Sequence, residues 1–251
     1  MQYTKRCDLH IHTQYSFDSK ATMKQYVDAA LCKGVDVLCF TDHIECGNFN
    51  TFRDFPFAAR AEEFHSLKQR YGKQLTLFLG FEVGEPHLHP KEMRFLRSLQ
   101  PDMIIGSVHY PASYLPERHY TNYEYQRLYD KFVSDMVSDG DFDVLGHMDL
   151  PKRYHDDYVE DVETLCKTLQ VCLQRGIVPE INTSRYFSRH FTLPSLEIIA
   201  KYRDFGGKFV TVNSDSHSAQ TLADGFDQVV SNLPQGLRLC YFCGGKIVPL
   251  Q

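Results

Sequence analysis

Short apolar segments rich in β-branched and aromatic residues alternate along this chain with longer segments of helical periodicity. Such alternation is typical of β-α units, in which helices join parallel strands. The predicted strands cover residues 7–12, 35–41, 75–82, 103–108, 142–147, 177–182 and 208–213, and the predicted helices cover 23–33, 57–71, 90–99, 122–138, 159–175, 195–205 and 221–232. Seven units therefore predict an α/β fold around a parallel sheet, followed by a last strand over 237–242 and a short tail at 246–249.

Helix boundaries and loop lengths complete this prediction. Thr22 is a plausible N-cap of the first helix and Gly34 closes it. No linker or low-complexity segment interrupts the seven units, so residues 1–251 are predicted to form a single domain of the size of one (β/α) barrel. The longest loops follow predicted strands, where such barrels build their active sites. They cover residues 44–56, 110–121 and 183–194.

Six predicted strands carry histidine or carboxylate side chains at their carboxyl ends. His10 and His12 are two residues apart, so on a strand they point to the same face. The other strand-end residues are His43, Glu82, His109, His147, Asp215 and His217. One such histidine is more often a core residue, but each of six buried imidazoles would need its own hydrogen-bond partner. The pattern therefore predicts a multinuclear metal site, and a mixed set of this kind suits Zn²⁺, iron or Mn²⁺.

Composition narrows the function classes. The net charge is −5, with 43% hydrophobic and 24% charged residues, so we expect no nucleic-acid partner. No apolar stretch approaches the ~20 residues that span a bilayer, and no signal peptide is recognisable, so we expect no membrane partner and a cytoplasmic location. Cys240 and Cys243 could form half of a zinc site, but no second pair exists. We therefore expect a terminal strand with two core thiols.

The motifs HxH, TDH, GxE, SVH, GH and SDSH follow one another along this chain. In that order, the set resembles the PHP (polymerase and histidinol phosphatase) family across essentially the whole sequence. The resemblance implies a distorted (β/α)7 TIM-like barrel with the active site at the C-terminal ends of the strands. It also implies a hydrolase of phosphate esters that uses three divalent metal ions.

The resemblance further implies a role for each matching residue. His10, His12, Glu82 and Asp215 would hold one ion, Glu82 would bridge to a second with His109 and His147, and Asp18, His43 and His217 would hold the third. Glu82, Asp215 and His217 are the expected catalytic residues among them. Asp42 and Glu180 are expected to orient the ligands from behind. Asp8 could do the same or face away.

A reaction follows from these roles. A water that bridges two ions becomes a usable hydroxide near neutral pH and attacks phosphorus in line. Arg153 and Arg185 are candidates to bind the phosphate, because a guanidinium pairs with phosphate in bidentate fashion. Both follow strands on the active-site side of the predicted barrel, and the sequence leaves the choice between them open.

Within the family, the chain is similar to stand-alone histidinol phosphatases. The similarity lies in its length, in GSVH followed by Tyr110, and in FDVLGHMDL followed by a basic pair. It implies hydrolysis of L-histidinol phosphate to L-histidinol and phosphate, a step of histidine biosynthesis. A small cationic substrate of this kind calls for a carboxylate and aromatic walls. The candidate residues are Glu45, Glu85, Tyr110 and Tyr114.

Other functions remain as alternatives. The loops that begin Ile-Glu-Cys-Gly after TDH and SRYFSRHFTLPS after the sixth strand depart from the expected subfamily pattern. A PHP phosphoesterase that acts on a sugar phosphate or a nucleotide is therefore the second hypothesis. A metallo-amidohydrolase would add a lysine at a strand end, and none is present. A degenerate barrel that only binds would have lost ligands, and all nine are present.

Overall fold

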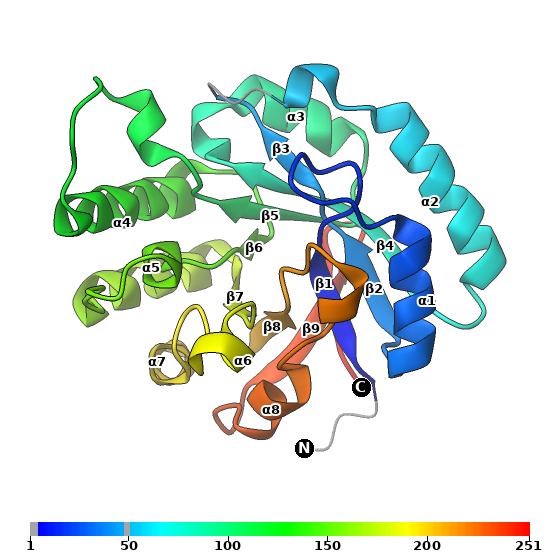
Figure 1. Ribbon diagram of the computed structural model, residues 1–251. Helices are drawn as coiled ribbons and strands as arrows, with labels where there is room; N and C mark the ends of the chain where they lie inside the picture. The colour runs from blue at the N-terminus through cyan, green and yellow to red at the C-terminus, as the bar shows by residue number, and fades with distance from the viewer. Residues whose placement is uncertain (1–4, 48–50) are drawn as a thin grey trace.

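The computed structural model describes residues 5–47 and 51–251, in which helices surround a twisted sheet of parallel strands (Figure 1). The strands are β1 (Cys7–Ile11), β2 (Val37–Phe40), β3 (His43–Glu45), β4 (Thr76–Gly84), β5 (Met103–Ser107), β6 (Val144–Leu145), β7 (Val178–Asn182), β8 (Phe209–Asn213), β9 (Arg238–Cys243) and β10 (Lys246–Pro249). The helices are α1 (Met23–Lys33), α2 (Phe57–Tyr71), α3 (Pro90–Ser98), α4 (Asn122–Asp139), α5 (Val162–Arg175), α6 (Tyr186–Arg189), α7 (Leu196–Asp204) and α8 (Phe226–Ser231). Short 3-10 turns lie between them.

The strands pair in the order β1-β2-β4-β5-β6-β7-β8-β9-β10, with β3 paired to β4. Every pair is parallel except β9 with β10. Within the described residues, hydrogen bonds do not close the sheet, although a single bridge from Ile11 to Ser216 brings the chain after β8 against β1. The predicted α/β class is confirmed, and the arrangement is consistent with a distorted TIM-like barrel.

Local sequence signals explain several helix ends. Thr22 and Gln25 form a capping box at the start of α1, and Gly34 ends the helix with a φ of 67°. A left-handed residue at this position satisfies the last carbonyl groups of a helix, and glycine adopts it without strain. Thr121 and Glu124 form an equivalent capping box on α4. Among the described residues, no helix is both long enough and apolar enough to cross a membrane.

The structure differs from the prediction at two strands. The second predicted strand, 35–41, corresponds to β2, and an additional strand, β3, lies where the sequence predicts the start of the loop 44–56. β3 continues the pairing with β4 that β2 begins. The predicted tail is the strand β10, which turns back on β9 through Gly244 and Gly245. The expectation for the two cysteines on β9 was half wrong, since Cys240 is buried but Cys243 is exposed.

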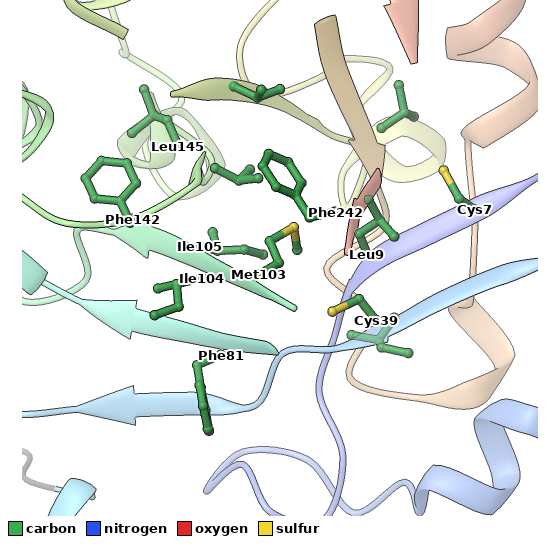
Figure 2. Packing of buried hydrophobic residues seen from close by; sticks show 14 of the residues in the cluster. Cys7, Leu9, Cys39, Phe81, Met103, Ile104, Ile105, Phe142, Leu145 and Phe242 are labelled. Atoms are coloured by element: carbon green, nitrogen blue, oxygen red, sulfur yellow. The ribbon is translucent and has the colours of Figure 1, made fainter. Parts of the chain in front are cut away.

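Apolar side chains of several strands meet in one core. Figure 2 shows Leu9 of β1, Cys39 of β2, Met103 of β5, Leu145 of β6 and Phe242 of β9 in this cluster. Full burial of a Leu or Phe side chain contributes roughly 1.5–3 kcal/mol. A packed interior of this kind fixes where each strand ends, and the strand ends carry the candidate site.

Candidate metal centre

All nine residues predicted as metal ligands lie around one basin at the carboxyl ends of the strands, with Glu82 of β4 at its centre. The Glu82 Oε1 atom lies 2.9 Å from His147 Nε2 and 3.2 Å from His109 Nε2. The Glu82 Oε2 atom lies 2.9 Å from His43 Nδ1 and 3.2 Å from His10 Nε2. One carboxylate therefore faces imidazoles that come from four other segments of the chain.

Sheet register explains part of this convergence. His43 of β3 is the direct partner of Glu82 in the β3-β4 ladder. Directly opposed residues of neighbouring strands project to the same face of a sheet. His10 lies on β1, and His12 is the first residue after this strand. The two histidines are two residues apart, so both imidazoles reach the basin.

The remaining ligand candidates follow β8. Asp215 has a φ of 53°, a left-handed conformation that aspartate tolerates better than most residues. Its Oδ1 atom lies 3.2 Å from His12 Nε2, and its Oδ2 atom accepts a hydrogen bond of 2.6 Å from Arg153 Nη2. His217 Nε2 lies 3.0 Å from Asp18 Oδ2, and His43 Nε2 lies 3.4 Å from the same oxygen.

Several buried atoms in the basin make no hydrogen bond to a described residue. They include His10 Nε2, His12 Nε2, His43 Nδ1 and Glu82 Oε2. Buried polar atoms without partners are costly, and a cation between imidazole and carboxylate groups removes that cost. Four groups of three side chains have ligand atoms close enough to share an ion: His12, His43 and His217; His10, His12 and Glu82; His10, His147 and Asp215; His43, Glu82 and His109. The donor set fits divalent metal ions.

The electrostatics of the basin favour the metal-binding forms of its carboxylates and of His12, whereas at His10, His43 and His109 burial lowers the pKa but the facing carboxylates outweigh it and raise the pKa above the usual value. Burial opposes ionisation of Glu82, but the facing His10, His109 and His43 hold its pKa well below the usual value. Burial likewise opposes ionisation of Asp215, but Arg153 and His10 hold its pKa well below the usual value. Burial, together with two neighbouring imidazoles, lowers the pKa of His12 to about 3. Ionised carboxylates and neutral imidazoles are the forms that coordinate metal ions.

Of the two residues expected to orient the ligands, Glu180 contacts ligand candidates directly, whereas Asp42 contacts the loop beside them. Glu180 Oε1 lies 2.8 Å from His10 Nδ1, and its Oε2 atom accepts a hydrogen bond of 3.0 Å from the His147 backbone N–H. Asp42 accepts hydrogen bonds from the loop that follows β1. Asp8 is buried and accepts hydrogen bonds from the His10 backbone N–H, from Ser214 beside Asp215, and from the Ala223 backbone beyond β8.

Two residues support the ligands in a role that the sequence did not predict for them. Glu45 Oε1 lies 2.7 Å from His109 Nδ1, and Ser107 Oγ donates a hydrogen bond of 2.6 Å to Glu82 Oε1. Glu45 lies two residues after His43 on β3. The alternation that placed His10 and His12 on one face could therefore have found Glu45 as well.

The structure corrects three candidates for substrate binding. Glu45 is buried and faces His109, while Glu85 is buried and accepts hydrogen bonds from the backbone N–H groups of His109 and Tyr110. Tyr114 Oη lies 2.8 Å from His89 Nε2. None of these three lines the pocket above the basin, whereas Tyr110 does.

A pocket of about 440 Å³ opens above the ligand candidates. Its aromatic walls are Phe17, Tyr110, Tyr125, Tyr129 and Tyr154. Arg153 and Arg185 both line it, but they differ in their partners. Arg153 donates to Asp215 and to Ser184, whereas the buried Nε of Arg185 has no hydrogen-bond partner among the described residues.

Comparison with known proteins places these features in a family. The family model described as "PHP domain" matches residues 8–184. A protein of Thermotoga maritima named "probable histidinol-phosphatase" is 27% identical over 228 residues, which cover 90% of this chain and 90% of that protein. The histidinol-phosphatase of Lactococcus lactis is 26% identical, with 86% of each chain covered.

A solved structure has the same fold. It is the histidinol phosphate phosphatase of Lactococcus lactis in complex with zinc, L-histidinol and phosphate. The TM-score is 0.82 at 22% sequence identity, and the match covers 97% of this chain and 99% of the other. The distorted barrel expected from the sequence is therefore confirmed as the fold of a known structure.

Proposed function

This chain belongs to the PHP domain family, and from that premise we propose that it hydrolyses L-histidinol phosphate to L-histidinol and phosphate. Relatives that bear the name histidinol-phosphatase match it over most of their length, which supports a metal-dependent phosphoric monoester hydrolase. The observation that carries the proposal is the convergence of nine imidazole and carboxylate side chains beneath a pocket with two arginines.

We propose three divalent ions, each held by its own set of side chains. The first set is His10, His12, Glu82 and Asp215; the second is Glu82, His109 and His147; the third is Asp18, His43 and His217. When bound, ions of this kind activate water and offset the negative charge on phosphate oxygens. The central position of Glu82, within 3.2 Å of four imidazoles, supports a shared carboxylate.

The chain's own side chains would orient the substrate above these ligands. Arg185 is the better candidate for the phosphate group, because its guanidinium lines the pocket without a carboxylate partner among the described residues. Arg153 pairs with Asp215, so its main effect would be to fix the position of that carboxylate. The remaining N–H groups of Arg153 would be available to phosphate. Tyr110 would contact the leaving group from the pocket wall.

The cellular role remains a proposal as well. The reaction belongs to histidine biosynthesis, which supports a cytoplasmic enzyme whose partner is a small phosphorylated metabolite. The net charge of −5 gives no reason to expect a nucleic acid.

One observation favours a second substrate class. Among the described residues, Asp18 and Asp215 are the only carboxylates that line the pocket and could pair with a cationic amine, since Glu45 faces His109 Nδ1 and Glu85 faces the His109 backbone N–H. A neutral leaving group, such as that of a sugar phosphate or a nucleotide, would not need such a partner. The same metal chemistry would then serve a different ester.

A phosphate-release screen separates these substrates. Zinc- and manganese-loaded protein is assayed with histidinol phosphate, hexose phosphates and nucleoside monophosphates, and with the variant His10→Ala as a control for contaminating phosphatases. We expect the highest kcat/KM for histidinol phosphate and no turnover by the variant. A higher kcat/KM for another ester would replace the substrate and leave the reaction class intact. Full activity of the variant would contradict the assignment of the metal centre.

A further inference from the structure

A buried arginine lies outside the candidate site but is connected to it. Arg60 of α2 is 1% exposed, and its guanidinium packs over the Phe81 ring at 4.8 Å. Its Nη2 donates to the carbonyl oxygens of Phe40 and Gly80, and its Nε donates to Asp42 Oδ2 at 2.6 Å. Burial of a charge costs free energy of folding unless the charge is paired and hydrogen bonded. The buried guanidinium of Arg60 therefore depends on these partners.

Asp42 divides its two oxygens between α2 and the loop after β1. While Oδ2 faces Arg60, Oδ1 accepts hydrogen bonds from the Thr13 N–H at 2.6 Å, from Thr13 Oγ1 at 2.8 Å and from Ser16 Oγ at 3.2 Å. Three donors on one oxygen fix the start of this loop. The position of Asp42 thereby sets the position of Ser16.

Ser16 contacts two of the ligand candidates. Its Oγ lies 3.1 Å from His12 Nδ1 and accepts a hydrogen bond of 3.0 Å from the His43 backbone N–H. A hydroxyl has a single proton to donate. If that proton is donated to Asp42, the hydroxyl must accept from His12 Nδ1–H. The His12 Nε2 atom then carries a lone pair, and it is this atom that faces Asp215 and Glu82 in the basin.

We propose that Arg60 is a positioning residue of the metal centre, which acts through Asp42 and Ser16 to fix the ring tautomer of His12 and the backbone of His43. This inference rests on one part of the proposed function, which is that the centre binds metal ions. Arg60 contacts neither ligand directly, and its effect depends on hydrogen-bond direction along one connected path.

A purely structural role for Arg60 makes a different prediction. Its bonds to Phe40 and Gly80 tie α2 to the sheet, so that role would lower stability without changing how the folded protein binds metal. A positioning role changes metal binding in protein that remains folded. Ligand-orienting partners typically affect metal affinity by about 10- to 100-fold.

The test uses three variants and one matched control. Arg60→Lys keeps the positive charge but loses the planar guanidinium group. The double variant Arg60→Met with Asp42→Asn removes both buried charges together, because a folded core tolerates the loss of a pair better than one unpaired charge. Ser16→Ala breaks the path at its far end, in the loop after β1. The control is Arg97→Lys, because Arg97 pairs with Asp141 and Asp143 just before β6, at the opposite end of the strands.

Each protein is first checked for folding by thermal melting. Zinc affinity is then measured against a competing chelator, without substrate, and the visible spectrum of the cobalt-loaded protein reports ligand geometry. We expect the folded Arg60 variants and Ser16→Ala to bind at least one zinc ion about 10- to 100-fold more weakly, with altered cobalt spectra. In turnover, kcat should fall more than KM rises. Arg97→Lys should match the wild type.

Unchanged zinc affinity and unchanged spectra in Ser16→Ala would overturn the inference, even if neither Arg60 variant folded. Folded Arg60 variants that bind zinc like the wild type would overturn it as well. These outcomes leave the proposed function in place. A wild-type protein that binds no zinc would overturn both proposals together.

Discussion

The inner and outer halves of the basin are built differently. The inner half comprises His10, Glu82 and His147, whose side chains are at most 2% exposed. The outer half comprises Asp18, His43 and His217, and the side chains of Asp18 and His217 are 36% and 33% exposed. The inner half is almost completely buried, whereas the outer half is more exposed and depends partly on the loop that carries Asp18.

The supports behind the ligands differ as well. In the inner half a buried carboxylate, Glu180, faces His10 Nδ1 and receives hydrogen bonds from Asn213 and the His147 backbone. In the outer half, Nδ1 of His217 faces the main-chain oxygen of Asp215 at 3.0 Å. A carboxylate behind an imidazole makes it a stronger metal ligand than a neutral acceptor does. We therefore expect the inner half to hold metal tightly and the outer half to exchange it.

The largest expected effect comes from the residue that the two halves share. Glu82→Gln leaves the shape of the side chain intact but removes its charge from between four imidazoles. We expect kcat/KM to fall by about 1,000-fold or more, which corresponds to roughly 4 kcal/mol of lost stabilisation. Initial rates with folded, zinc-loaded protein measure this. The control is Glu163→Gln, an exposed carboxylate on α5, and a loss of less than tenfold would mean that Glu82 is not shared.

The next effect tests the inner half alone. In Glu180→Gln, one of the two oxygen positions becomes an NH₂ group. Both positions face donors, since Oε1 accepts from Asn213 and Oε2 accepts from the His147 N–H. The mismatch disturbs either His10 or His147, depending on which way the amide turns. We expect zinc affinity to drop about 10- to 100-fold, measured by chelator competition. An unchanged zinc affinity would show that the carboxylate behind His10 supports metal binding through its imidazole no better than the main-chain oxygen behind His217 does.

A smaller effect is expected in the outer half. Asp18→Asn weakens the ligand that lies between His43 and His217. We expect the bound zinc to fall by one ion per chain while the inner ions stay, with a loss of activity of about tenfold or more. Metal analysis after gel filtration gives the stoichiometry. Loss of all the metal would show that the halves bind cooperatively rather than separately.

The smallest effect belongs to the pocket wall. Arg185→Met removes a guanidinium that lines the pocket but contacts no ligand candidate by hydrogen bond or ion pair among the described residues. We expect KM to rise about tenfold, because a hydrogen bond to a charged group contributes roughly 1.5–3 kcal/mol, while zinc affinity stays unchanged. Arg189→Met is the matched control, because Arg189 ends the short helix α6 that Arg185 directly precedes and pairs with Asp156. Altered zinc binding in Arg185→Met would place this arginine within the metal centre.

Features that depend on neighbouring residues were predictable from the sequence. Spacing by two residues placed His10 and His12 together, and capping residues gave the ends of α1. The same spacing would have reached Glu45. Spacing along the chain could not predict the contact of Arg60 with Asp42, because the two residues are 18 positions apart. Arg60 also lies on α2, a helix whose sequence is otherwise typical of the protein surface. Only packing of α2 against β2 and β4 brings that pair together.

By itself, the sequence determined the succession of strands and helices and the type of chemistry at the strand ends, because periodicity and residue type are local properties. Only the tertiary structure decided which carboxylates face metal ligands, as Glu45 and Glu180 do, and which side chains face the pocket, as Arg185 does. Those contacts join residues tens to hundreds of positions apart. Their geometry is fixed by the packed core and the strand register, which no short stretch of sequence contains.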